Sequence, residues 1–174
     1  DLDLPVAFHI LTSRHGSIHA ETRGHALNNF LGIIRAIQDI VGLLTLGGVF
    51  ERHPNLKVVV AESDVGWLPH YMYRMDHAVN REGGVMGYQR LSKMPSEFCL
   101  DHIRLTFQDD WVAFKMCRLD DSPMHKMLTW ANDFPHHEGT WPYSAQAIER
   151  TMAQLRDDER AKILGLNTAR LFRF

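Results

Sequence analysis

Apolar runs of strand length alternate along this chain with longer stretches whose apolar positions recur at helical spacing. The short runs predict buried strands at residues 4–10, 56–61, 103–107 and 126–131. Apolar residues three and four apart predict helices over 25–41 and 67–80, with shorter helices over 111–118 and 144–155. Acidic residues at 157–159 predict the start of a last helix, which we expect Gly165 to close.

The order of these elements predicts the fold class. Four units of strand followed by helix imply a parallel sheet, because parallel neighbours are joined by a crossover that is normally a helix. We therefore expect an α/β fold. The glycine-rich phosphate loop of dinucleotide-binding folds does not follow the first strand, so that class loses support.

Composition and charge narrow the function classes. The 174 residues carry 19 Lys and Arg against 21 Asp and Glu, a formal net charge of -2, which argues against a nucleic-acid-binding protein. Every apolar run is interrupted well before the roughly 20 residues of a membrane span, and no secretory signal begins the sequence. The two cysteines, Cys99 and Cys117, argue against a disulfide framework, so we expect a cytoplasmic protein. From the length we expect one domain over residues 1–174.

Ionisable residues occur where the predicted strands end. His9 lies near the end of the first strand, Glu62 follows the second, and Asp133 follows the fourth. Ligands of parallel α/β folds bind at the C-terminal ends of the strands, and this set suits zinc or another divalent first-row metal. Each residue alone fits a hydrogen-bonded structural role better than a ligand role, and it is their joint placement that brings metal binding level with it.

The segment 132–144, Asn-Asp-Phe-Pro-His-His-Glu-Gly-Thr-Trp-Pro-Tyr-Ser, is the densest group of such residues. An aspartate at a strand end, followed by a loop with His136, His137 and Glu138, is suited to metal binding, general base catalysis or substrate orientation. A surface loop anchored by Trp141 remains the alternative.

Four segments, in this order, resemble the amidohydrolase-related family that contains aminocarboxymuconate-semialdehyde decarboxylase. They are Gly-Gly-Val-Phe-Glu-Arg-His-Pro-Asn-Leu-Lys-Val-Val-Val-Ala-Glu-Ser at 47–63, Thr-Phe-Gln-Asp-Asp at 106–110, Asn-Asp-Phe-Pro-His at 132–136 and Ile-Leu-Gly-Leu-Asn-Thr-Ala-Arg-Leu-Phe at 163–172. The resemblance covers nearly all of the chain. It implies a partial (β/α)8 barrel, the C-terminal half with strands five to eight.

The same resemblance implies roles for individual residues. His9 matches the fifth-strand histidine that ligates metal, and Asp133 matches the eighth-strand aspartate that binds metal and handles the proton of the attacking water. Glu62 stands where many members have a histidine and is the candidate third ligand. His136 and Trp141 are expected to shape the substrate pocket.

The function implied is that of a metal-dependent hydrolase or non-oxidative decarboxylase for a small carboxylate, amide or ester, with zinc as the expected metal. Because the first-strand His-x-His pair of the family lies outside this sequence, we expect the chain alone to bind metal weakly and to show no robust hydrolase activity. The alternatives are a non-catalytic α/β module for binding or assembly, and a purely structural remnant.

We expect the loop 134–143 to lie over the C-terminal ends of the strands, with Trp141 packed inward. A complete barrel takes about 250 residues, so four strands should leave two edges and an apolar inner face open. Open edges and apolar patches favour a homo-oligomer or a missing N-terminal half, although an open sheet covered on both faces would allow a monomer. The residues predicted for the open face are Val6, Phe8, Val58, Val60, Leu105, Phe107, Leu128 and Trp130.

The remaining histidines divide into two predicted groups. His15, His19 and His25 follow the first strand and are candidates for the rim of the site. The others are expected to be solvated or structural: His53, His70, His77, His102 and His125.

Overall fold

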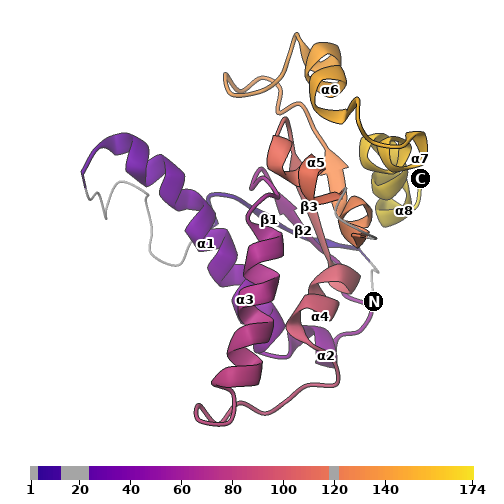
Figure 1. Ribbon diagram of the computed structural model, residues 1–174. Coiled ribbons are helices and arrows are strands. Elements are labelled where there is room, and N and C mark those ends of the chain that lie inside the picture. The colour runs from indigo at the N-terminus through magenta and orange to yellow at the C-terminus, as the bar shows by residue number, and fades with distance from the viewer. Residues whose placement is uncertain (1–3, 13–23, 118–121) are drawn as a thin grey trace.

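The computed structural model, drawn in Figure 1, describes residues 4–12, 24–117 and 122–174. All four predicted strands are present, three of them shorter than the apolar run that predicted them. They pair in parallel in the order β1-β2-β3-β4, which confirms the α/β class. Their bounds are β1 (Val6–His9), β2 (Val58–Ala61), β3 (Ile103–Phe107) and β4 (Leu128–Trp130).

Helices connect successive strands and follow the last one. Within the described residues, no helix combines the length and the apolar character needed to cross a membrane. In chain order the elements are α1 (Ala26–Leu46), α2 (Val49–Arg52), α3 (Leu68–Arg81), α4 (Pro95–His102), α5 (Trp111–Cys117), the 3-10 turn η1 (Pro123–Lys126), α6 (Ser144–Met152), α7 (Asp157–Ala161), the π turn η2 (Lys162–Leu166) and α8 (Asn167–Phe172).

The prediction that Gly165 closes the last helix is wrong. The chain passes through η2, which contains Gly165, and continues into α8. Asn167 explains the continuation, because its buried side-chain amide donates to the carbonyl oxygens of His125 and Leu128, both at 2.8 Å. These two bonds hold the last helix against β4, so a tertiary contact overrides the local stop signal.

One face of the sheet packs against the helices and forms the core. Val58, Val60, Leu105, Phe107 and Leu128 are at most 1% exposed. These residues were predicted to line an open inner face, and that prediction is wrong because the helices cover the face on which they lie. Apolar alternation alone identifies a buried face without saying which layer buries it.

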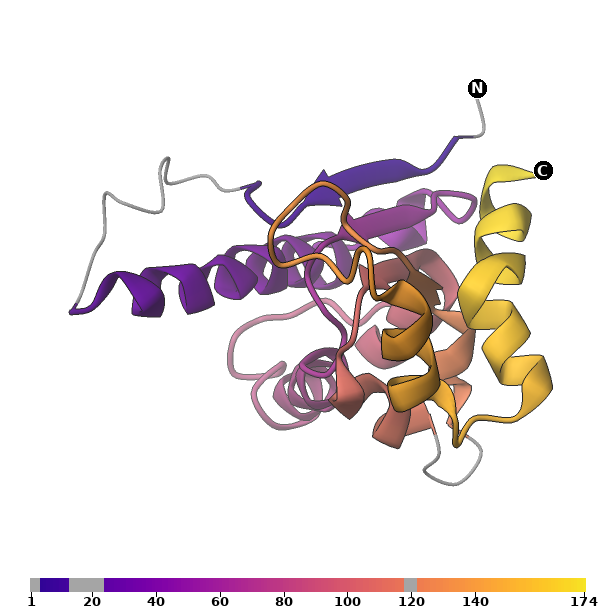
Figure 2. The same ribbon diagram turned by 90° about the horizontal axis from the view of Figure 1, so that it is seen from above.

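The opposite face of the sheet is the more polar one, and Val59 and Thr129 on it are 6% and 5% exposed. Its rows in register are Ala7 with Val59 and Arg104, and, nearer the C-terminal ends, Thr106 with Thr129. Seen from above in Figure 2, β1 lies along the outside of the molecule and α1 crosses beneath it. The strands β1 and β4 are the edges of this sheet. A sheet of this kind carries chemistry at its strand ends and on its polar face.

Candidate metal centre

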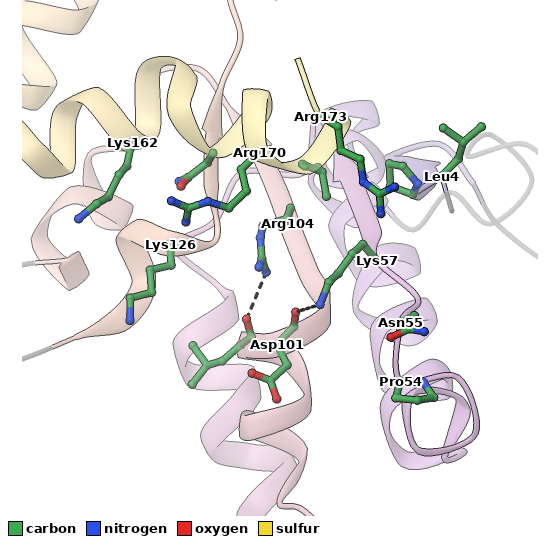
Figure 3. Close-up of a pocket in the computed structure, with 14 residues that line it drawn as sticks. Leu4, Pro54, Asn55, Lys57, Asp101, Arg104, Lys126, Lys162, Arg170 and Arg173 are labelled. Atoms are coloured by element: carbon green, nitrogen blue, oxygen red, sulfur yellow. Dashed lines mark hydrogen bonds between the residues drawn. The ribbon is translucent and has the colours of Figure 1, made fainter. Parts of the chain in front are cut away.

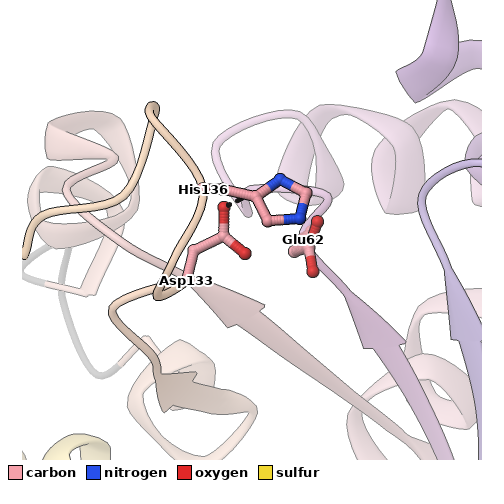
Figure 4. A group of neighbouring side chains, drawn as sticks. All are labelled: Glu62, Asp133 and His136. Atoms are coloured by element: carbon pink, nitrogen blue, oxygen red, sulfur yellow. Dashed lines mark ion pairs between the residues drawn. The ribbon is translucent and has the colours of Figure 1, made fainter.

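Three side chains converge beyond the C-terminal ends of β2 and β4 (Figure 4). Glu62 directly follows β2, and Asp133 and His136 belong to the segment that follows β4. One ligand atom from each lies within 4.8 Å of those from the other two. Ligands held about 2.1 Å from a common ion are separated by roughly 3 to 4 Å, so a small rearrangement would bring all three to one ion.

The backbone at both carboxylates adopts the left-handed conformation. Glu62 has a φ of 57° and Asp133 a φ of 58°. Non-glycine residues reach this region at a cost of about 1–2 kcal/mol, and such residues concentrate at functional sites. The amide of Glu62 donates to the Thr106 hydroxyl at 2.8 Å, which fixes the turn after β2 to the neighbouring strand. With this backbone conformation, both carboxylates come together beyond the C-terminal ends of the strands.

His9 and Gln108 hold the two carboxylates from either side. The His9 Nε2 atom lies 2.8 Å from a carboxylate oxygen of Glu62. The Gln108 side-chain amide donates to Asp133 at 3.2 Å, and its own carbonyl oxygen is buried without a hydrogen-bond partner among the described residues. Gln108 thus reaches the carboxylate pair through its amide nitrogen alone.

The loop 134–143 folds back over this rim, as predicted. The amide of His136 donates to the Asp133 carbonyl oxygen at 2.8 Å, and the amide of Thr140 donates to the Asn132 carbonyl oxygen at 3.1 Å. Gly139 permits this close return, because a Cβ atom there would lie 2.5 Å from the Asn132 carbonyl oxygen. The loop therefore brings the His136 imidazole, whose Nδ1 lies 3.9 Å from the Asp133 carboxylate, to the strand ends.

The expectation that Trp141 packs inward is wrong. Its side chain is 59% exposed and packs edge-on against Phe134, with ring centroids 5.7 Å apart. Phe134 is itself 63% exposed. The indole therefore has only a small exposed partner in place of a core, and both rings form part of the outer surface of the loop.

The electrostatics of the site favour a cation. Burial, followed by the nearby negative charge of Glu62, raises the pKa of Asp133, whereas His136 and the hydrogen bond from Gln108 act in the opposite direction. Two carboxylates that face each other in a partly buried site repel, and a divalent cation between them would remove that repulsion.

Asp110, another acidic residue at a strand end, has a structural role. One carboxylate oxygen accepts hydrogen bonds from the amides of Val65 and Gly66 at 2.9 and 2.6 Å. The other accepts from the amide of Val112 at 3.0 Å. Asp110 thereby joins the turn after β2 to the start of α5 and stabilises the segment that follows Glu62.

The structure brings together most of the residues that the sequence selected. Glu62, Asp133 and His136 form one group, and His9 contacts that group through Glu62. Trp141 lies on the loop that carries His136. Gln108 was missed as an individual residue, although its position directly after β3 is the signal that selected the others.

The other histidines do not all follow their predictions in the part of the chain that the structure describes. His102 is buried, stacks on Phe50 with ring centroids 4.5 Å apart and bonds to the Leu56 carbonyl oxygen at 2.7 Å, which confirms a structural role. His25, predicted near the rim, instead caps α1 by accepting from the amide of Leu27 at 3.2 Å. The predictions for His15 and His19 lie outside the described residues.

Solved structures with the same fold include decarboxylases and amidohydrolases. The chain is similar to 5-carboxyvanillate decarboxylase from Sphingomonas paucimobilis, with 21% identity and a TM-score of 0.79, covering 99% of this chain and 50% of that one. It is also similar to an amidohydrolase from Mycobacterium avium subsp. paratuberculosis K-10, with 24% identity and a TM-score of 0.74, covering 98% of this chain and 42% of that one. A third similar structure is a dihydroxybenzoic acid decarboxylase from Polaromonas sp. JS666, solved with bound manganese and the inhibitor 2-nitroresorcinol. Its identity is 16% and its TM-score 0.69, and the match covers 99% of this chain and 50% of that one.

The chain thus spans about half the length of the TIM-barrel proteins it resembles in structure. No protein with curated annotation matches it in sequence. The family model described as amidohydrolase matches residues 1–174, and the family resemblance of the four sequence segments is thereby confirmed. The chain belongs to the amidohydrolase family.

Proposed function

We propose that this chain is the C-terminal half, strands five to eight, of a metal-dependent non-oxidative decarboxylase of aromatic carboxylates. The observation that carries the proposal is the convergence of ligand atoms from Glu62, Asp133 and His136 within 4.8 Å at the C-terminal rim. The names of the solved relatives add the substrate class, since they include 5-carboxyvanillate and dihydroxybenzoic acid decarboxylases. The Asn-Asp-Phe-Pro-His segment after β4 supports the placement in the second half of a barrel.

The donor set favours manganese over the zinc expected from sequence. Two carboxylates and one imidazole form an oxygen-rich set, and oxygen ligands suit manganese and magnesium better than they suit zinc. The Polaromonas relative was solved with manganese. When bound, such an ion would polarise a substrate carboxylate or phenolate oxygen and stabilise negative charge that develops during the reaction. His9 then orients Glu62 through its hydrogen bond, as partners of ligating carboxylates commonly do.

Asp133 is the group that would carry the proton. In decarboxylation the bond between the ring carbon and the carboxylate carbon breaks, carbon dioxide leaves, and the electron pair that remains on the ring takes up one proton. The Asp133 carboxyl projects from the rim and is held in place by Gln108 at 3.2 Å. It is therefore positioned both to ligate the ion and to pass a proton to a substrate above the sheet.

The loop offers a surface for an aromatic ring. Phe134, Trp141 and Tyr143 are 63%, 59% and 68% exposed, and they flank the segment that carries His136. Aromatic rings pack favourably edge-on or offset against one another, so this group suits a benzoate-type substrate. In this arrangement Trp141 contributes to substrate binding as an exposed ring at the entrance of the site.

The ligand set is tested by titrating the chain with manganese and monitoring binding through the electron paramagnetic resonance signal of free Mn²⁺. We expect weak binding by the chain, and an affinity at least about tenfold lower for Asp133→Asn and Glu62→Gln, which keep shape but remove charge. Asp109→Asn is the matched control, since Asp109 is an exposed carboxylate at the same end of the sheet, bonded to Arg150. Circular dichroism verifies that each variant folds.

The outcome also separates enzyme from module. Unchanged manganese affinity in both variants would contradict the proposal and favour the non-catalytic binding or assembly module, whose support is the half-length span of the chain. Carbon dioxide release from dihydroxybenzoate is the activity assay. The chain alone is expected to show no robust turnover, because the metal ligands contributed by the first half of the family's barrel lie outside this sequence.

A further inference from the structure

A second charged site lies at the end of the sheet opposite to Glu62 and Asp133. The N-terminal ends of the strands, together with η2 and α8, surround a cavity of about 730 Å³ (Figure 3). Its lining includes one carboxylate, that of Asp101. It also includes six cationic side chains, those of Lys57, Arg104, Lys126, Lys162, Arg170 and Arg173.

The parallel sheet gathers these cations. Lys57 directly precedes β2, Arg104 is the second residue of β3, and Lys126 lies just before β4. Because all strands run in the same direction, residues at their starts meet at one edge, where α8 adds Arg170. Cations that are dispersed along a sequence of net charge -2 thus meet at one end of the fold.

Carboxylates neutralise part of the positive charge of this cavity, since Lys162 pairs with Asp158 at 2.9 Å. Asp101 pairs with Lys93, outside the lining, at 2.7 Å. The Lys57 ammonium donates to the Asp101 backbone carbonyl at 2.8 Å, and Arg104 donates to the carbonyl oxygens of Leu100 and Ile103 at 3.1 and 2.7 Å.

These bonds satisfy donors without supplying negative charge. In the part of the chain that the structure describes, no carboxylate lies within ion-pair distance of Lys57, Arg104 or Arg170. Burial, followed by the positive charge of Arg104, lowers the pKa of Lys57. Burial also lowers the pKa of Arg104, with Asp101 acting in the opposite direction and Arg170 in the same one. Both shifts agree with cations crowded into a partly enclosed space.

We propose that this cavity binds a small molecule that carries two or more anionic groups, phosphate or carboxylate. Its volume falls within the roughly 300–1,000 Å³ of small-molecule sites. Guanidinium groups bind both kinds of oxyanion through paired hydrogen bonds, and ammonium groups add point charges. A strand of about four residues spans roughly 13 Å, so this site is separate from the metal-side residues.

Isothermal titration calorimetry with pyrophosphate and, separately, with citrate tests the proposal. We expect at least one of the two probes to bind, and its affinity to fall as the salt concentration rises. The double variant Lys126→Gln with Arg170→Gln removes two exposed cations of the lining and should lower that affinity at least about tenfold. Arg104→Gln should lower it further. The probe that binds more tightly identifies the preferred anionic group.

Arg74→Gln is the matched control, because Arg74 is an exposed cation on α3 outside the lining. Its affinity for either probe should equal that of the unmodified chain. Arg104 is partly buried, so the double variant at the two exposed cations, Lys126 and Arg170, decides the result independently of how the Arg104 variant folds. No measurable binding of either probe, or equal affinity in the double variant and the control, would overturn the proposal.

Discussion

At Glu62, Asp64 and Asp133 the backbone takes a left-handed conformation that their side chains disfavour. At Glu62 and Asp133 this conformation accompanies carboxylates that belong to the candidate metal centre. Asp64, with a φ of 53°, lies outside the three-residue ligand group. Burial and the carboxylates of Asp110 and Asp109 raise the pKa of Asp64 to about 6, so its side chain is also in an unfavourable electrostatic environment.

Asp64→Gly is therefore expected to raise the free energy of unfolding by about 1 kcal/mol, measured by urea denaturation. Glycine adopts this φ freely, and the substitution also removes a repelled carboxylate. The matched control is Asp39→Gly, the same chemical change inside α1, which should lower the free energy of unfolding by about 0.3–0.5 kcal/mol. A loss of stability in both variants would contradict the interpretation of strain at Asp64.

The lowered pKa of the buried His102 side chain leads us to expect that the stability of the fold depends on pH. Burial is the main cause that lowers the pKa of His102 below its ordinary value of 6.5. The unfolded chain therefore takes up this proton first as the pH falls, and stability that is present above about pH 6.5 is lost progressively below it. The pKa of His125 is lowered in the same direction, by burial and then by Lys162.

We expect the free energy of unfolding to decline between about pH 7.5 and about pH 5.5, and His102→Gln to make that decline shallower. His70→Gln, at an exposed position on α3, is the control and should leave the slope unchanged. The measurement is a series of urea unfolding curves across the pH range. An equal slope in all three proteins would count against a neutral buried His102.

At the scale of elements, α1 divides into two halves with different environments. Ile37 and Val41 are 0% exposed, whereas Leu27 and Leu31 are 65% and 66% exposed. Figure 1 shows the first half of this helix extending away from the sheet. The apolar spacing in the sequence is similar in both halves, so periodicity alone did not distinguish the half that packs from the half that does not.

Ile37→Ala is expected to lower the free energy of unfolding by about 2–4 kcal/mol, because it leaves a cavity in the core. Leu31→Ala should change it by less than about 0.5 kcal/mol, since the side chain buries little area. Chemical denaturation of both variants under the same conditions measures the difference. Similar losses at the two positions would indicate that the exposed half of α1 is covered in solution.

At the scale of the whole molecule, the sheet has two unpaired edges. β1 is one of them, and its Val6 side chain is 45% exposed. Unpaired edges promote pairing with other chains. The sequence-based argument for association rested on the two open edges and on an apolar face that the helices in fact cover. The edges alone now carry the expectation of a homo-oligomer or of pairing with a missing half.

Size-exclusion chromatography with light scattering is expected to show a species larger than the 20.1 kDa monomer. Val6→Lys should shift the distribution towards monomer, because a lysine on an edge strand opposes pairing with a second chain. Lys115→Gln, on α5, is a control that should leave it unchanged. A stable monomer of the unmodified chain at high dilution would contradict the expectation.

The sequence by itself determined the α/β class, the four strands and the strand-end positions of His9, Glu62 and Asp133. These properties depend on local periodicity and on the rule that parallel strands place their ends together. Tertiary structure decided which face of the sheet is covered, where Trp141 lies, and that the chain continues as a helix past Gly165. It also decided the contact of Gln108 with Asp133 and the meeting of Lys57, Arg104 and Arg170 around one cavity. These features depend on contacts between residues far apart in the sequence, and local patterns do not encode which distant groups meet.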